Sequence, residues 1–299
     1  MTQLDAHQHY WEVDRAFRLG EYPEFLGVVT YGWKQAGLQA LDRSYLPADL
    51  EPQMGAAGVA QSVVANALNN LGETQWLLQL AAECSSLAGV IGWVDLTRRP
   101  EQVEATLLEL RRNPKLCSLR HLVEFEPDDD WLLRPDVIAG LRVLERHAIA
   151  YDLLLRPRHL RRVPALSDKA PALRLVIDHL GKPDIKNGVL EPWRSDLAVA
   201  AQNPSVFCKL SGMVTEADHA GWRPDHLVPY VEAALAAFGV ERLMFGSDWP
   251  VCTLAATYEQ VHSALHYALG QILGRLDEET ERVLFYDNAR RFYHLSPEG

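Results

Sequence analysis

Short apolar segments rich in β-branched residues recur along this chain, and most intervals between them carry apolar residues at helical spacing. The segments predict strands at residues 4–9, 59–66, 90–96, 119–124, 149–155, 173–180, 206–210 and 243–246. Apolar stripes predict helices around residues 103–110, 137–144, 227–238 and 258–269. From the second strand on, the spacing is near one strand–helix–strand unit of roughly 30 residues. Eight strands that alternate with helices predict a (β/α)8 TIM barrel in a single domain, residues 1–299.

A doubly wound open sheet is the alternative fold. It would need a glycine-rich turn after an early strand, and His9-Tyr10-Trp11 does not provide one. The helices after the fifth and sixth strands are weakly marked, because Pro164, Pro171, Pro183 and Pro192 interrupt the helical spacing.

One interval, residues 10–58, is too long for a simple crossover and is rich in aromatic residues. A long aromatic-rich loop after strand 1, over the catalytic end of a barrel, is typical of a substrate pocket or its lid. We expect most of these aromatic side chains to pack the loop onto the barrel. Trp11 and Trp33 are the two that we predict to contact substrate.

The composition is that of an ordinary globular protein, with 48% hydrophobic and 23% charged residues. A net charge of -11 argues against a nucleic-acid partner or an anionic membrane surface. Without a leader-like start or a membrane-spanning apolar run, the default expectation is a cytoplasmic protein, and a homo-oligomer is compatible with it. The four cysteines form no C-x-x-C pair and predict buried, reduced thiols.

Polar residues at the carboxyl ends of barrel strands are the ones that carry chemistry. His7 and His9 are two apart on the first strand, so their side chains point to the same face. Asp248 follows Phe-Gly-Ser at the last strand, where a general base or a metal ligand would sit, or an aspartate that caps a turn. His179 emerges from the buried sixth strand, and Asp178 is expected to point the opposite way. The other strand-end candidates are Arg120, His121, Glu124, Tyr151, Asp152 and Lys209.

Several of these segments together resemble the amidohydrolase superfamily, in particular its amidohydrolase-2 branch of lactone hydrolases, which contains sugar lactonases of the fuconolactonase and rhamnonolactonase kind. The resemblance lies in residues 5–11 (DAHQHYW), 92–96 (GWVDL), 119–121 (LRH), 178–183 (DHLGKP), 209–212 (KLSG), 245–250 (FGSDWP) and 288–293 (NARRFY). It implies a barrel in which His7, His9, His179 and Asp248 converge in one site.

The superfamily usually places histidines on both the fifth and sixth strands and a bridging Lys or Glu on the fourth. Here the fifth strand offers Tyr151-Asp152 and the fourth Arg120-His121, which argues against a two-metal centre. His7, His9, His179 and Asp248 are compatible with a single Zn²⁺ or Mn²⁺, and equally with metal-free catalysis of an electrophilic lactone.

The resulting hypothesis is hydrolysis of a small-molecule sugar (aldono-) lactone. Asp248 would act as general base, and His179 with His121, or a metal, would stabilise the oxyanion. The expected substrate-binding residues are Trp11, Trp33, Arg120, Glu124, Tyr151, Asp152 and Lys209. Acidic and aromatic groups together favour a neutral polyol over a dicarboxylate. Lys209 and Glu124 could instead form a structural ion pair.

Other functions remain open on the same barrel. They are a 2-pyrone-dicarboxylate-type or muconolactone-type lactonase, a metal-dependent decarboxylase of an aromatic acid, and a non-catalytic sugar-binding protein.

Overall fold

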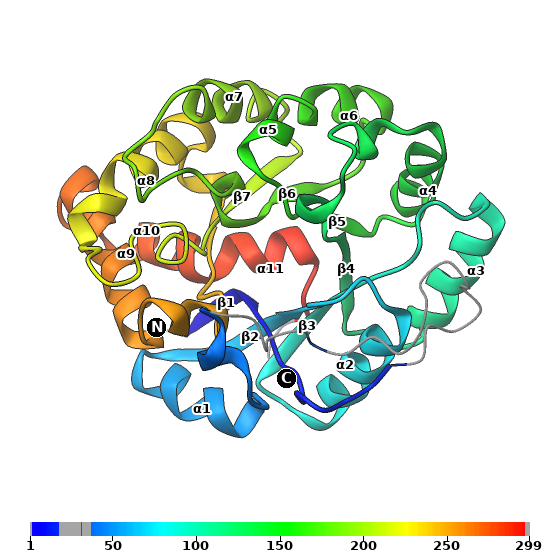
Figure 1. Cartoon of the computed structure of the whole chain (residues 1–299), viewed down its shortest axis with the longest axis horizontal. Helices are drawn as coiled ribbons and strands as arrows, with labels where there is room; N and C mark the ends of the chain where they lie inside the picture. The colour runs from blue at the N-terminus through cyan, green and yellow to red at the C-terminus, as the bar shows by residue number, and fades with distance from the viewer. Residues whose placement is uncertain (1, 18–30, 32–36, 297–299) are drawn as a thin grey trace.

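The strands form one parallel sheet that curves round almost into a closed barrel. The computed structural model describes residues 2–17, 31 and 37–296. In this part of the chain an eight-stranded sheet runs in sequence order from β1 to β8 (Figure 1). The chain just after β8 contacts the end of β1, where Gln8 forms a β-bridge with Trp249 and the Asp248 amide donates to the His7 carbonyl. The predicted TIM barrel is therefore confirmed.

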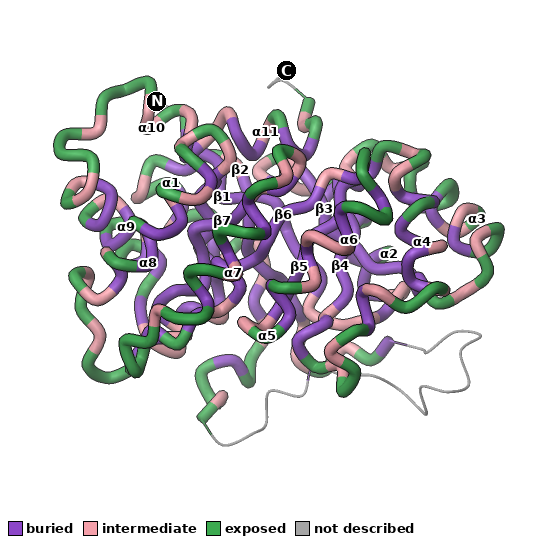
Figure 2. The backbone as a smooth tube through the Cα atoms, turned by 90° about the horizontal axis from the view of Figure 1, so that it is seen from above, coloured by how far each residue is buried: buried purple, intermediate pink, exposed green. Residues whose placement is uncertain are grey.

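Each predicted strand is present, with boundaries shifted by a few residues. The strands are β1 Gln3–Gln8, β2 Val59–Ala65, β3 Leu87–Gly92, β4 Leu116–His121, β5 Ala150–Leu153, β6 Leu175–Ile177, β7 Val206–Leu210 and β8 Leu243–Phe245. Their β-branched and aliphatic residues are buried on both faces, as parallel strands covered by helices require. Figure 2 shows these buried strands at the centre, surrounded by helices whose outer faces are exposed.

The helices lie outside the strands, except the last one, α11, which follows β8. They are α1 Pro47–Ala56, α2 Leu71–Glu83, α3 Pro100–Leu110, α4 Pro135–Arg146, α5 Pro157–Leu160, α6 Val163–Lys169, α7 Trp193–Ala200, α8 Pro224–Phe238, α9 Tyr258–Leu273, α10 Glu278–Arg282 and α11 Asn288–Tyr293. The four helices predicted from apolar stripes match α3, α4, α8 and α9. Prolines that interrupted the pattern after the fifth and sixth strands instead begin short helices: Pro164 lies in the first turn of α6, and Pro192 caps α7.

The end of the barrel where the strands begin is closed by α11. Phe292 and Tyr293 of this helix pack with inward-facing residues of the strands, among them Leu4, Val63 and Met244. In Figure 2, α11 lies on one side of the strands and α5 on the other. At the opposite end, the carboxyl ends of the strands surround the candidate active site.

Of the long interval between β1 and β2, the described residues include α1 and several side chains that line the site end, among them Trp11 and Tyr31. Trp11, Tyr31 and Tyr45 pack together there, with Trp11 and Tyr45 edge-to-face at 5.4 Å between ring centroids. Trp33, predicted to contact substrate, lies outside the described residues. Cys117, Cys208 and Cys252 are buried free thiols, and Cys84 is half-buried. Among the helices of the described residues, none is long and apolar enough to cross a membrane.

Candidate active site

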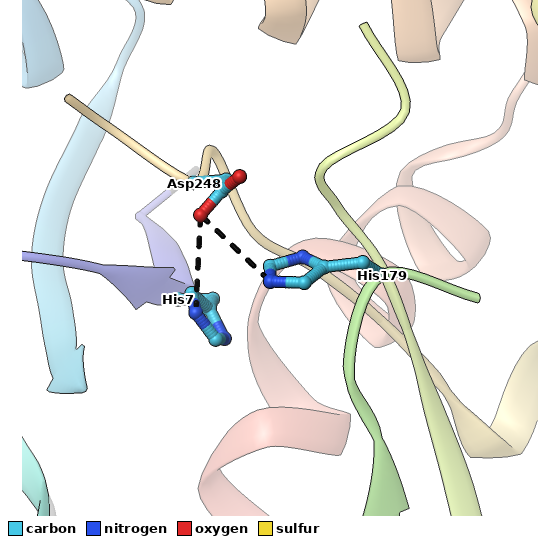
Figure 3. Close-up of side chains that lie close together, drawn as sticks. All are labelled: His7, His179 and Asp248. Carbon is cyan, nitrogen blue, oxygen red and sulfur yellow. Dashed lines mark ion pairs between the residues drawn. The ribbon is translucent and has the colours of Figure 1, made fainter. Parts of the chain in front are cut away.

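Three imidazoles surround one carboxylate at the carboxyl ends of the strands. Asp248 Oδ1 lies 4.0 Å from His7 Nε2, 3.5 Å from His9 Nε2 and 3.8 Å from His179 Nε2. Figure 3 shows Asp248 between His7 and His179, with the three side chains turned toward one another. The side chains of His9, His179 and Asp248 are 4–6% exposed, and that of His7 is fully buried. The convergence of groups from β1, β6 and β8 is thus observed.

Backbone and neighbouring hydrogen bonds orient the two outer imidazoles. His9 Nδ1 lies 2.8 Å from the Ala65 carbonyl at the end of β2, which leaves Nε2 to face Asp248. His179 Nδ1 lies 2.8 Å from the Ser211 hydroxyl, and its Nε2 likewise faces the carboxylate. The Ala65 carbonyl can only accept, so it fixes both the orientation and the tautomer of His9, whereas the Ser211 hydroxyl fixes the orientation of the His179 ring. Such partners are common where imidazoles bind a metal or move a proton.

A left-handed turn after β6 brings His179 into the site. His179 and Leu180 both have a φ of 54°, a region that non-glycine residues rarely adopt. Gly212, at a φ of 62°, lets the ring lie against the end of β7, because a Cβ there would come within 2.6 Å of His179 Nδ1. The position of the imidazole therefore depends on backbone strain that the surrounding fold maintains.

The same turn overturns the expected orientation of Asp178. Strand alternation predicted that it points away from His179, but Asp178 lies inside the barrel. Its Oδ2 accepts from Arg120 at 3.0 Å, and its Oδ1 lies 2.9 Å from Lys209 Nζ. Because the chain leaves the strand at Ile177, simple alternation no longer applies to the two residues that follow.

The charge states at the site follow from burial and from the neighbours. Burial alone would raise the pKa of Asp248, but His179, His9 and Lys182 outweigh it and the pKa lies below its ordinary value of 3.8. Burial lowers the pKa of His179 from 6.5 to about 4, despite the nearby Asp248. The pKa of His7 is lowered well below 6.5 by burial and then by Lys209. At neutral pH the site is a carboxylate among neutral imidazoles.

This arrangement fits one divalent metal ion. The donor atoms of four-coordinate zinc lie about 3.3 Å apart. Here His7 Nε2 lies 3.2 Å from His9 Nε2, and Asp248 Oδ1 lies 3.5–4.0 Å from the three imidazole nitrogens. His7, His179 and Asp248 form a ligand group on their own. Arg120 Nη1 lies 3.1 Å from His7 Nε2 and competes for that nitrogen.

A cavity of about 590 Å³ opens above the carboxylate. His9, Arg120, His179 and Asp248 line its floor. The lining includes many apolar side chains, namely Trp11, Tyr31, Leu38, Leu41, Ala67, Leu68, Leu122, Phe125, Leu154, Val251 and Leu254. It also includes the charged and polar side chains of Asn69, Glu124, Arg156, Lys182, Thr215 and Glu216. Trp11, Arg120 and Glu124 thus line the cavity, and their contact with substrate stays a prediction.

The charged lining residues form a network of ion pairs that the sequence did not reveal. Lys182 Nζ donates to both oxygens of Glu124, at 2.8 and 2.7 Å. Arg156 Nε lies 3.0 Å from Glu124, and its Nη1 lies 3.7 Å from Glu216. Burial raises the pKa of Glu216, although Lys182 and Arg156 oppose the shift. Glu124 therefore pairs with Lys182 and Arg156, and the alternative of a Lys209–Glu124 ion pair is wrong, because Lys209 pairs with Asp152.

Four other predicted residues do not line the cavity. His121 stacks on Trp131 and contacts Trp93 Nε1 at 3.1 Å and Glu126 at 2.6 Å, so both ring nitrogens are engaged. Tyr151 is buried among the residues between strands and helices. Asp152 and Lys209 lie inside the barrel and are bonded to each other at 2.6 Å. Lys182 and Glu216, which do line the cavity, come from loops where no strand pattern marks a direction.

Comparison with known proteins identifies relatives whose similarity extends over nearly the whole chain. The amidohydrolase family model matches residues 4–295. An L-fucono-1,5-lactonase from Burkholderia multivorans is 39% identical over 307 residues, covering 98% of this chain and 96% of that protein. An L-fucono-1,5-lactonase from Burkholderia ambifaria is 36% identical over 300 residues, which cover 99% of this chain and 97% of that protein.

A solved structure agrees with these matches. An amidohydrolase from Burkholderia multivorans, crystallised with bound zinc, superposes with a TM-score of 0.86 at 36% identity, covering 99% of this chain and 100% of that chain. The motifs at the strand ends thus indicated the right relatives, and the chain belongs to the amidohydrolase family.

Proposed function

We propose that this protein hydrolyses the ring ester of a neutral sugar lactone. The observation that carries the proposal is the Asp248 carboxylate among three imidazoles, on the floor of a cavity that is large enough for a monosaccharide. The 36–39% identity to two L-fucono-1,5-lactonases supports the same reaction.

Asp248 is the general base. It takes a proton from water as the water oxygen bonds to the lactone carbonyl carbon, and it returns that proton to the ring oxygen when the ring C–O bond breaks. The product is the open-chain hydroxy acid, which loses its carboxyl proton to solvent. His179 and the Arg120 guanidinium, both on the cavity floor, stabilise the oxyanion by their charge and dipoles. We assign this role to Arg120 rather than to His121, because both nitrogens of His121 are engaged elsewhere.

The mixed lining favours a neutral substrate that also has an apolar part. Arg156 and Lys182 are already paired with Glu124 and Glu216, so these charged groups offer hydroxyl-binding atoms more than a free site for a second carboxylate. This argues against a dicarboxylated pyrone. The apolar lining residues, among them Tyr31 and Leu41, suit a methyl group or the C–H face of a sugar. We therefore infer a 1,5-lactone of a deoxy sugar acid such as L-fuconate.

His7, His9, His179 and Asp248 are the residues that would hold a divalent metal ion such as Zn²⁺ or Mn²⁺. When bound, such an ion supplies Lewis-acid polarisation of the lactone carbonyl. The proton transfers remain with Asp248 in either case. A cytoplasmic location and a homo-oligomeric state stay predictions.

The test is a panel of 1,5- and 1,4-aldonolactones, followed by acid release at neutral pH with and without a chelator. We expect L-fucono-1,5-lactone to open well above its spontaneous rate. The same panel with Asp248→Asn should fall close to that spontaneous rate. Release of CO₂ from an aromatic acid, or lactone opening that survives Asp248→Asn, would contradict the proposal.

A further inference from the structure

A second group of metal-like ligands lies directly below the active site and is filled by a lysine. His7 Nδ1, an oxygen of Asp152 and an oxygen of Asp178 lie within 4.8 Å of one another. Lys209, on β7, places its Nζ among them, 2.9 Å from His7 Nδ1, 2.6 Å from Asp152 Oδ2 and 2.9 Å from Asp178 Oδ1. The side chains of Lys209, Asp152 and Asp178 are all fully buried.

The ligand types are those that hold divalent ions in proteins. One imidazole nitrogen and two carboxylate oxygens suit Zn²⁺, Mn²⁺ and similar ions. Two buried carboxylates also need a positive charge beside them, because an unpaired buried charge is strongly unfavourable. Here the Lys209 ammonium supplies the positive charge, since it contacts the same three atoms that a metal ion would contact.

His7 connects this lower position to the active site. One of its ring nitrogens, Nδ1, contacts Lys209, and the other, Nε2, faces His9 and Asp248. The two cation positions are therefore on opposite sides of a single imidazole ring. Two metal ions placed there would be bridged by His7.

We propose that the Lys209 ammonium is a built-in cation that occupies a second metal position and so limits this active centre to a single metal ion. Tyr293 holds the arrangement from below, because its hydroxyl donates to Asp152 Oδ2 at 2.7 Å. Ser118 donates to the other Asp152 oxygen at 2.5 Å. These bonds fix the carboxylate whichever cation is present. The inference concerns cation binding and does not depend on which lactone the enzyme opens.

The test compares the wild type with Lys209→Ala and Lys209→Met. Each protein is purified, saturated with Mn²⁺ and dialysed, and its metal content is measured by elemental analysis. The wild type should bind no more than one ion per chain. Lys209→Ala removes the ammonium and leaves space, so it should bind one ion more than the wild type. Lys209→Met fills the space with an uncharged chain and should gain none.

Two further readouts separate this role from a general loss of packing. The melting temperature of Lys209→Ala should rise with added Mn²⁺ or ammonium ions, and that of Lys209→Met should not. If Lys209→Ala is unfolded in the absence of added cations, the variant is refolded in the presence of Mn²⁺ or ammonium ions before the measurement. The electron paramagnetic resonance spectrum of Mn²⁺-loaded Lys209→Ala should show a coupled pair, whereas the wild type shows isolated ions.

Three results would overturn the proposal. The first is a wild type that binds two ions in this centre. The second is a Lys209→Ala variant with the same metal content as the wild type. The third is a Lys209→Ala variant that neither folds nor gains stability with Mn²⁺ or ammonium, or that responds no more than Lys209→Met. Because metal content and melting need no substrate, each result can be read even if the lactones are not hydrolysed.

Discussion

The inside of the barrel holds two layers of charged residues that differ in how completely they are paired. The lower layer, Asp152, Asp178 and Lys209, is fully buried, with each acid within 2.9 Å of the ammonium. The upper layer, Asp248 with His9 and His179, lines an open cavity, and the two imidazole nitrogens lie 3.5 and 3.8 Å from the carboxylate. Groups already bonded at short distance hold the structure, whereas loosely surrounded groups beside a cavity are free to bind water and move protons.

Replacement of the upper carboxylate should have the largest effect on catalysis. Asp248→Asn removes the base and keeps the shape, so we expect kcat/KM for lactone hydrolysis to fall by about 10²- to 10⁴-fold. The melting temperature should change little, since no ion pair of this carboxylate within the described residues is shorter than 3.5 Å. Initial rates on L-fucono-1,5-lactone and a thermal melt test both points. A variant that keeps most of its rate would show that the base lies elsewhere.

The matched change in the lower layer should act on stability instead. Asp152→Asn leaves the buried Lys209 with one carboxylate fewer, and we expect the free energy of unfolding to fall by about 3–5 kcal/mol. Urea denaturation monitored by fluorescence measures this loss. The folded fraction should keep its turnover within a few-fold. Loss of turnover at unchanged stability would mean that the two layers are not divided as described.

The two layers were predictable from the sequence to different extents. Strand alternation places His7 and His9 on one face, and apolar strands mark where Asp248 and His179 emerge, so the upper layer followed from local pattern and family likeness. The lower layer did not, because Asp178 follows a left-handed turn that no apolar pattern signals. Partners across the barrel, such as Lys209 with Asp152, depend on register and on strand inclination. The same holds for Lys182 and Glu216, whose loops set the direction of their side chains.

A glycine substitution tests whether the upper layer depends on the position of His179. In Gly212→Ala the new Cβ would meet the His179 ring at 2.6 Å, and displacement of a reacting group by about 1 Å can cost roughly 10²-fold in rate. Gly239→Ala is the control, because Gly239 has a nearly equal φ of 64° and no atom within 4 Å of its ideal Cβ. Both variants should lose stability, but only Gly212→Ala should lose kcat. Equal losses of kcat would contradict this role of Gly212.

The smallest effect should be that of pH between about 5.5 and 8. The active form needs an ionised Asp248, whose pKa lies below 3.8, and a neutral His179, whose pKa is lowered to about 4. Since both conditions are met throughout the range from pH 5.5 to 8, kcat/KM should be flat there and should fall as the pH drops through about 4 and His179 takes up a proton. Because the pKa of His179 is about 4 in the folded chain and 6.5 in the unfolded one, the unfolded chain binds more protons between these two pH values. The contribution of His179 to the free energy of unfolding therefore increases as the pH rises from 4 to 6.5. Rates in buffers of constant ionic strength, corrected for spontaneous lactone opening, measure the profile. An acid limb centred near pH 6.5 would mean that His179 is more hydrated than its 4% exposure indicates, and that the upper layer is open to water even without substrate.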